Sequence, residues 1–176
     1  MGAKSSKNKY RRIFMTGLEG AGKTSILNQL KGKETITRIP SPGFNHETLQ
    51  VKNMFFDSID IDPSGNIKTL WKDIYSDTDF VIYVIDASNK EKIDEAVEEF
   101  QKLLKEEELK ECPVLIYANK QDIKEALTPN EITQKIQADF SVLRNRIWLV
   151  QGSDAIGFKG INEGMDWIKG VLNKKK

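Results

Sequence analysis

Cysteine and histidine are almost absent from this sequence of 176 residues, which contains one of each. A single thiol, Cys112, excludes an internal disulfide and is typical of proteins from reducing compartments. Its position just before an apolar run predicts a small packing residue. His46 is the only imidazole, so no histidine-based catalysis is predicted, and we expect this side chain to face solvent from a strand.

The sequence also lacks an excess of charge of one sign and any long apolar run. Its formal net charge is +1, which gives no general electrostatic attraction for nucleic acid. No apolar run approaches the roughly 20 residues needed to cross a bilayer, and the first residues are too charged for a secretory signal. With 39% hydrophobic residues, the composition is ordinary for one globular domain. We therefore expect a cytoplasmic monomer without a nucleic-acid partner.

Short apolar runs recur at residues 13–15, 80–85, 114–118 and 147–150. Runs rich in β-branched residues are typical of strands buried on both faces, as in a parallel sheet. Between them, apolar residues recur at helical spacing. These are Ile93, Ala96, Val97, Phe100, Leu103 and Leu104, and then Ile161, Met165, Ile168 and Leu172. The alternation predicts a three-layer α/β domain with a mostly parallel sheet, in which ligands bind beyond the carboxyl ends of the strands.

Residues 44–61 depart from this alternation, because two strand-like segments follow each other directly. The segments 48–51 and 54–61 flank Lys52 and Asn53. Two residues between two such segments predict an antiparallel hairpin, in which we expect Asn53 to adopt the left-handed conformation.

The segment GLEGAGKT, residues 17–24, follows the first predicted strand and opens a helical pattern. It matches G-x-x-x-x-G-K-[ST], in which backbone N–H groups surround phosphates, the lysine reaches the outer phosphates and the final hydroxyl binds Mg²⁺. The predicted nucleotide contacts are Gly17, Leu18, Glu19, Gly20, Ala21, Gly22, Lys23, Thr24 and Ser25.

The segment NKQD directly follows another predicted strand and indicates a base-binding loop. A carboxylate at Asp122 can accept hydrogen bonds from the N1–H and the amine of guanine, which adenine cannot supply. Asn119 would brace the loop, and the stem of Lys120 would cover the flat base. After the last strand, Ser153, Asp154 and Ala155 form a weaker signal, in which the Ala155 N–H would meet the guanine oxygen.

Together these residues resemble the ADP-ribosylation-factor (Arf) and Arf-like family of small Ras-like GTPases, from about Tyr10 to Leu172. The similar segments are GLEGAGKT, IPSPGFNHET, the KN turn, LWKDIY, YANKQD and EGMDWI. The resemblance implies a Ras-like P-loop domain at residues 10–173, with a mostly parallel six-stranded sheet and one antiparallel hairpin. A flexible basic extension (1–9) and a basic tail (174–176) would flank it. The implied activity is that of a switch that binds GTP or GDP with Mg²⁺.

The resemblance also implies a metal site and a partner surface. Thr24 would bind Mg²⁺, Ser41 would join the metal in the triphosphate state, and an aspartate would hold its water shell. The family's partner-facing positions correspond to Phe44, Ile59 and Ile74. Effector proteins would bind this surface, which is made of the switch segments and the hairpin. The resemblance also implies two further partners, an exchange factor and an activating protein.

The segment IDIDPSGNI, residues 59–67, diverges from the family's Asp-x-x-Gly-Gln, in which the glutamine orients the attacking water. Aligned without gaps, Asp60 is the metal-shell aspartate, Pro63 replaces the glycine and Ser64 replaces the glutamine. Shifted by two residues, Asp62 takes that role and Asn66 stands for the glutamine. We favour the alignment without gaps, because the hairpin turn and LWKDIY then need no adjustment.

Neither alignment supplies a glutamine, so the sequence predicts slow intrinsic GTP hydrolysis and assigns no catalytic residue. The alternative is a GTP-bound interaction module that does not hydrolyse the nucleotide.

The chain begins MGAKSS, which matches the pattern for N-myristoylation at Gly2. The basic residues Lys4, Lys7, Lys9, Arg11 and Arg12 follow, with no acidic residue before Glu19. An acyl chain and a basic cluster are the two signals that together hold a protein at a membrane. The alternative is a solvated basic tail without lipid. Peripheral membrane binding, as in membrane trafficking, is therefore an expectation for this end of the chain.

Overall fold

The computed structural model describes residues 10–32, 36–41, 44–61 and 68–174. Within these ranges the strands are β1 (Arg11–Leu18), β2 (Thr37–Ser41), β3 (Phe44–Val51), β4 (Met54–Ile61), β5 (Phe80–Asp86), β6 (Val114–Asn119) and β7 (Trp148–Gly152). The helices are α1 (Lys23–Lys31), α2 (Lys68–Ser76), α3 (Ile93–Leu104), α4 (Pro129–Gln137) and α5 (Ile161–Lys174), with short 3-10 turns at Glu107–Leu109 and Phe140–Val142.

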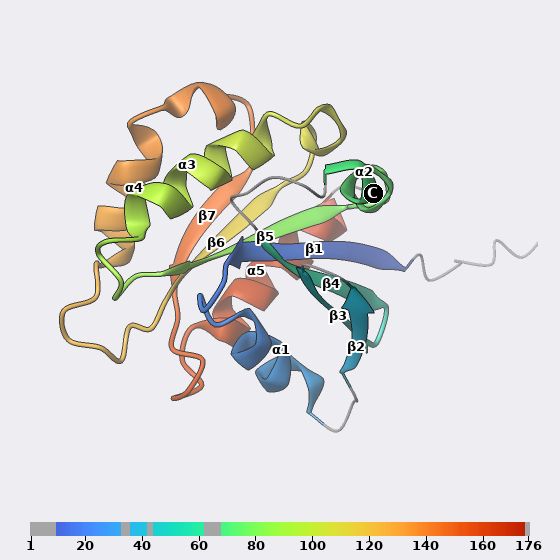
Figure 1. Cartoon of the computed structure of the whole chain (residues 1–176), viewed down its shortest axis with the longest axis horizontal. Helices are drawn as coiled ribbons and strands as arrows, with labels where there is room; N and C mark the ends of the chain where they lie inside the picture. The colour runs from blue at the N-terminus through green and yellow to red at the C-terminus, as the bar shows by residue number, and fades with distance from the viewer. Residues whose placement is uncertain (1–9, 33–35, 42–43, 62–67, 175–176) are drawn as a thin grey trace, which may run out of the picture.

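All the described strands form one sheet, in the order β2-β3-β4-β1-β5-β6-β7 (Figure 1). From β4 through β1, β5 and β6 to β7 the neighbouring strands run parallel, whereas β3 is antiparallel to both of its neighbours, β2 and β4. The predicted fold class, a mostly parallel sheet with an antiparallel hairpin at residues 44–61, is confirmed. The described sheet has seven strands rather than six, because residues 37–41 pair with β3 and add an edge strand.

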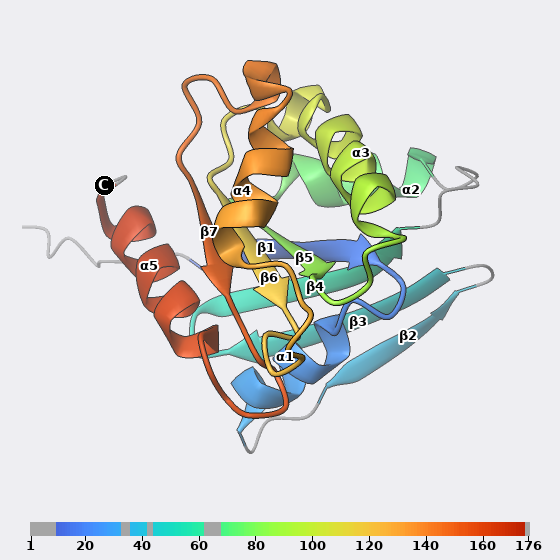
Figure 2. The same cartoon turned by 90° about the vertical axis from the view of Figure 1, so that its left-hand side faces the viewer.

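Helices cover both faces of the sheet, giving the predicted three layers (Figure 2). One buried cluster joins Phe14 of β1 and Tyr83 of β5 to Tyr75 of α2 and to α3 and α4. The other joins Ile13 and Met15 of β1 to α1 and α5. The two clusters use alternate residues of the same strand, as the two-residue period of a strand requires. Every apolar residue of the two predicted helical stripes is buried.

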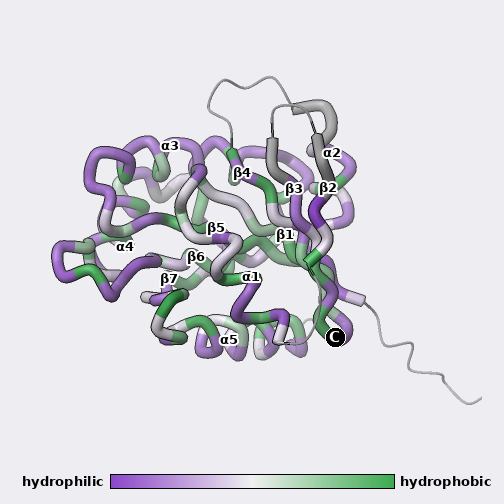
Figure 3. Tube along the Cα trace, turned by 60° about the horizontal axis from the view of Figure 1, so that its bottom comes forward, coloured by the Kyte–Doolittle hydropathy of each residue, from purple (hydrophilic) through white to green (hydrophobic). Residues whose placement is uncertain are grey.

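Strands β5 and β6 are buried along almost their whole length and are the apolar centre of the molecule (Figure 3). Strand β7 differs, because it lies at the edge of the sheet and all its residues are only half-buried. The prediction of full burial for residues 147–150 is therefore wrong. Ile147 lies outside the strand and is 50% exposed. Cys112 is buried just before β6, as predicted.

Two buried tyrosine hydroxyls connect the central strands to the helices on opposite faces. Tyr83 of β5 donates to the Ala96 carbonyl of α3 at 2.8 Å, and Tyr117 of β6 donates to the Ile161 carbonyl of α5 at 2.8 Å. A Cβ at Gly164 would lie 2.4 Å from the Tyr117 hydroxyl oxygen, so α5 needs glycine there to approach the sheet. These contacts fix the helices relative to the strand ends where the motifs lie.

The hairpin turn differs from its prediction in one residue. Lys52, not Asn53, has the positive φ, at 54°. The Asn53 carbonyl instead accepts a hydrogen bond from the Arg11 N–H at 2.8 Å, which continues the pairing of β1 with β4 into the turn. Positive φ at the first of two turn residues is one of the standard geometries of a hairpin turn.

His46 does not face solvent as expected. Its side chain is 14% exposed, and Nε2 lies 3.3 Å from the Asp57 carboxylate, which also accepts from Arg12 at 2.8 Å. Burial opposes ionisation of Asp57, but the hydrogen bonds from His46 and Arg12 outweigh it and lower the pKa of this carboxyl. His46 on β3 is therefore part of a polar cluster with Asp57 of β4 and Arg12 of β1.

None of the helices in the described part of the chain has the length and the apolar composition that crossing a bilayer requires.

Candidate functional site

The predicted motifs lie at one edge of the sheet, where the parallel strands β1, β6 and β7 end. GLEGAGKT joins β1 to α1, NKQD begins at the last residue of β6, and Ser153 follows β7. The carboxyl ends of parallel strands share an edge, which is where open α/β sheets bind ligands. The structure thus brings together three segments that are about 100 and 30 residues apart in the sequence.

The GLEGAGKT loop turns from β1 into α1 through glycines with positive φ. Gly22, which precedes the helix, has φ 106°, and no side chain caps the helix N-terminus. The first turn of α1 contains no acidic residue. Free N–H groups and the partial positive charge of a helix N-terminus favour an anion at this point. Ser25 is exposed in this first turn, and Glu19 and Gly20 are exposed in the loop.

Lys23 is held inside this loop rather than extended into solvent. Its side chain is 4% exposed and its Nζ donates to the carbonyls of Gly17 and Leu18 at 2.9 and 2.7 Å. The same ammonium lies 2.7 Å from a carboxylate oxygen of Asp60, at the end of β4. Burial lowers the pKa of Lys23, and the Asp60 carboxylate opposes this effect. An incoming phosphate would therefore find the lysine already positioned and paired with Asp60.

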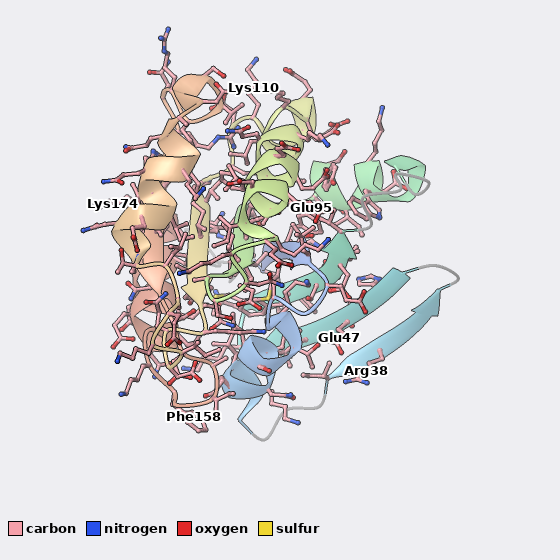
Figure 4. All side chains as sticks on the ribbon, turned by 60° about the vertical axis from the view of Figure 1, so that its left-hand side comes forward. Arg38, Glu47, Glu95, Lys110, Phe158 and Lys174 are labelled. Atoms are coloured by element: carbon pink, nitrogen blue, oxygen red, sulfur yellow. The ribbon has the colours of Figure 1, made fainter. Side chains whose placement is uncertain are left out.

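Thr24 is bound by Glu47, a residue to which the sequence gave no role. The Thr24 hydroxyl donates to one oxygen of Glu47 at 2.8 Å, and Arg38 contacts the other at 2.9 Å (Figure 4). Glu47 is buried, and it connects α1 to β3 and β2. The signal available in the sequence was the alternation of β3, which turns Glu47 to the same face as Leu49, the face that α1 covers.

Oxygen ligands near Thr24 suit a hard cation such as Mg²⁺. The Thr24 hydroxyl, the Glu47 carboxylate next to it and the Asp60 carboxylate beside Lys23 are all oxygen donors. Mg²⁺ in nucleotide sites takes one or two protein oxygens and completes its shell with waters and phosphates. Among the described residues no cluster of three or more acidic, histidine or cysteine side chains forms an all-protein cage. Thr24 and Asp60 fit the predicted metal role, and Ser41 lies in β2, its backbone paired with Phe44.

Asn119 links the first two motifs. Its side-chain amide donates to the Ala21 carbonyl in the GLEGAGKT loop at 3.0 Å, and its side-chain oxygen accepts from the Ser153 hydroxyl at 3.1 Å. A Cβ at Gly22 would lie 2.2 Å from the Asn119 amide nitrogen, so only glycine permits this approach. Asn119 is buried, and its two side-chain hydrogen bonds connect the NKQD segment to the GLEGAGKT loop and to the loop after β7.

Lys120 and Asp122 lie beyond this brace. Lys120 has φ 66° and its ammonium lies 2.7 Å from Asp86 at the end of β5. Asp122 is exposed. The Gln121 N–H donates to the Ser153 carbonyl at 3.0 Å, which joins the NKQD loop to the loop after β7.

The loop after β7 is held by its own aspartate. The Asp154 carboxylate accepts from the N–H groups of Ile156 and Gly157 at 3.0 and 2.8 Å, so it shapes the turn. Ala155 is 6% exposed, and its carbonyl accepts from Gln29 of α1. The contact with Gln29 places Ala155 beside α1, and the hydrogen bonds of Asp154 show that its carboxylate stabilises the turn.

One predicted partner-facing residue is corrected. Ile59 is 1% exposed and lies in the same buried cluster as Tyr75 of α2, because its position on β4 points towards that helix. Its side chain therefore contributes almost no accessible surface. Ile74 is half-buried on α2, next to the same cluster.

Several other predicted residues lie outside the described residues. These are Asp62, Pro63, Ser64 and Asn66 after β4, and Gly2 and Lys4 to Lys9 near the start of the chain.

The chain matches the sequence profile of the ADP-ribosylation factor family over residues 1–172. The chain belongs to that family. Among solved structures it is similar to the Arl6 BBS3 small GTPase from Trypanosoma brucei with the bound nucleotide analogue GppNp. The two share 26% sequence identity and superpose with a TM-score of 0.77, over 96% of this chain and 100% of that one. The Arf-family membership inferred from the motifs is thus confirmed, and it implies a nucleotide-binding switch.

Proposed function

We propose that this Arf-family protein is a molecular switch that binds GTP or GDP together with Mg²⁺ and recruits effector proteins in one nucleotide state. The phosphates would occupy the loop between β1 and α1, where Lys23 and the N-terminus of α1 meet them. The base would lie between the Lys120 stem and the loop after β7, with Asp122 at its hydrogen-bonding edge.

The observation that supports this proposal most is the placement of Asn119. It hydrogen bonds to the Ala21 carbonyl in the phosphate loop and to Ser153 in the third loop. A polar turn after β6 without a ligand would have no need to contact either segment. The contacts instead fix the guanine loop at a set position from the phosphate loop, as a nucleotide spanning both requires. Identification of the nucleotide that co-purifies with the protein tests the proposal directly, and ATP as that nucleotide would refute it.

Guanine selectivity should depend on Asp122. We expect ATP to bind about a thousandfold or more weakly than GTP, because adenine leaves the polar edge of the site unpaired. Asp122→Asn should weaken GTP binding by about 1.5–3 kcal/mol, roughly tenfold to a hundredfold, and strengthen xanthosine triphosphate binding, because the amide donates where the carboxylate accepted. Competition titrations with the three nucleotides measure both changes. Asp166→Asn makes the same change of charge at an exposed position of α5 and should alter neither affinity. Equal affinities of the unmodified protein for ATP and GTP would contradict the assignment.

Mg²⁺ would be held by Thr24, by Ser41 in the triphosphate state and by water on Asp60, and it would supply positive charge to the phosphates. Partners would bind at Phe44 and Ile74, which lie on β3 and α2, the elements that precede and follow β4 in the sequence. We expect to find a partner protein that binds the GTP state and not the GDP state. Ile74→Asp should abolish this binding. Binding that is unchanged in the variant would exclude Ile74 from the surface.

Membrane binding would use Gly2 acylation and the basic N-terminus. Arg11 is paired with Asp79 and Arg12 with Asp57, so the proposal does not count these two arginines among the residues that contact lipid. Lys4, Lys7 and Lys9 remain as the lipid-facing charges of the proposal.

Replacement of these three lysines by glutamine should weaken binding of the acylated protein to anionic vesicles by about 3 kcal/mol, roughly a hundredfold. Salt at 1 M, which shortens the screening length to about 3 Å, should have a similar effect. Vesicle flotation measures both, with Gly2→Ala as the control that lacks the acyl chain. Binding that withstands high salt would instead indicate an inserted apolar segment.

A second candidate function is a GTP-bound interaction module that hardly hydrolyses its nucleotide. Two sequence features favour it: no glutamine follows β4 at the expected position, and Pro63 offers no N–H to a phosphate. The rate of hydrolysis separates the two functions.

A further inference from the structure

Asp86 ends β5 beside the base loop, and none of the sequence motifs includes it. It pairs in register with Asn119, at the end of the neighbouring strand β6. Its two carboxylate oxygens have separate partners. Oδ2 lies 2.7 Å from the Lys120 ammonium, and Oδ1 accepts from the Ser88 N–H and hydroxyl at 3.0 and 2.6 Å.

These contacts hold Asp86 ionised and in one orientation. Burial alone would raise the pKa of the Asp86 carboxyl, but the hydrogen bonds from Lys120 and Ser88 outweigh it, and the pKa lies below its ordinary value. The side chain is 19% exposed, so the pair with Lys120 is more sheltered than an ordinary surface ion pair.

Lys120 is thereby fixed at both ends of its side chain. Its backbone adopts φ 66°, next to the Gln121 N–H that donates to the Ser153 carbonyl. Its ammonium is fixed by Asp86, at a neighbouring strand end. The aliphatic stem between these two points has little freedom left. A free lysine side chain, by contrast, loses rotamer entropy when it is ordered.

We propose that Asp86 is a positioning residue for guanine binding, which acts by holding the Lys120 stem in the place where it covers the base. The inference rests on the proposed nucleotide function and adds a determinant of nucleotide release to it. Because the stem is ordered before the base arrives, binding does not have to order it. Without Asp86 the stem is mobile, and the base loses a preformed surface.

The variant Asp86→Asn tests this with the least disturbance. The asparagine oxygen still accepts from Ser88, so the turn is kept, whereas the ion pair with Lys120 is lost. We expect the rate constant of GDP dissociation to rise about threefold to tenfold, the range for the ordering of one flexible side chain. Release of a fluorescent GDP analogue measures it. Asp94→Asn breaks an ion pair of the same 2.7 Å length, between Asp94 and Lys135, away from the base loop, and should leave the rate unchanged.

A double-mutant cycle separates positioning from a general role in folding. Lys120→Met keeps an apolar stem but removes the ammonium, so Asp86→Asn should have no further effect on GDP release in that background. Binding of inorganic pyrophosphate, which has no base, should be the same in all four proteins. Additive effects of the two substitutions, or an equal loss of pyrophosphate binding, would overturn the proposal. If the unmodified protein binds pyrophosphate but no guanine nucleotide, the proposed function itself fails, which is a different result.

Discussion

Lys23→Met should weaken GTP binding by about 2–5 kcal/mol, thirtyfold to several thousandfold, while the protein stays folded. Methionine keeps the apolar length of the lysine but removes all three donors. In the structure those donors serve the carbonyls of Gly17 and Leu18 and the carboxylate of Asp60. Because Lys23 is 4% exposed, water cannot replace its charge at a phosphate bound in the same loop. Isothermal titration with GTP measures the loss.

Metal dependence distinguishes Lys23 from Thr24. Thr24→Val has nearly the same shape as threonine but no hydroxyl, so it should weaken GTP binding only when Mg²⁺ is present, whereas Lys23→Met should weaken it with Mg²⁺ and with EDTA alike. Lys31→Met, in the last turn of α1, makes the same change of charge far from the loop and is the matched control. GTP affinity of Lys23→Met within twofold of the unmodified protein would remove the phosphate site from this loop.

Contiguous features were the ones that the sequence predicted well. The loop at residues 17–24 and the NKQD segment are local patterns, and buried strands such as β5 and β6 are apolar throughout. The placement of such motifs at one edge then follows from the parallel sheet alone. The helices containing Phe100 and Ile168 were likewise predictable from a single period of 3.6 residues.

Residues whose role depends on a partner in another segment of the chain were not predictable. Glu47 binds Thr24 and Arg38, and Asp86 binds Lys120, yet the sequence assigned a role to neither acidic residue. His46 was expected in solvent, but Asp57 on the neighbouring strand pairs with it. Ile59 was expected at the surface and is covered by the cluster that includes Tyr75 of α2. Each error comes from a side chain that meets another segment, which the pattern along one strand does not record.

The end of β4 bears on the alignment of residues 59–67. Asp60 pairs in register with Gly17, and its carboxylate lies 2.7 Å from the Lys23 ammonium. An aspartate at the phosphate loop is what the alignment without gaps requires of its metal-shell residue. This position favours Asp60 over Asp62 for that role. Pro63 then replaces the glycine that would donate to the γ-phosphate, and Ser64 replaces the water-orienting glutamine.

The unmodified protein should consequently hydrolyse GTP more slowly than about 3 × 10⁻⁴ per second, the lower end of Ras-type intrinsic rates. Phosphoryl transfer depends on positioning and on charge stabilisation, and the side chain of serine is too short to orient the attacking water. Lys23 and Mg²⁺ would still bind the triphosphate. Tight GTP binding with very slow turnover is therefore the expected combination, and an activating protein that donates the missing group would raise the rate.

Single-turnover hydrolysis of bound GTP, measured on Ser64→Gln and Asn66→Gln, decides both the mechanism and the alignment. If Ser64 stands at the glutamine position, Ser64→Gln should accelerate hydrolysis by about tenfold to a hundredfold, the gain expected from correct positioning of one reacting group. Asn66→Gln should then have no effect, and the reverse result would assign Asp62 to the metal. Ser64→Leu adds similar bulk without a polar group and should not accelerate the reaction. If the unmodified protein already turns over at Ras-type rates or faster, another residue orients the water, because neither Ser64 nor Asn66 has the reach of glutamine.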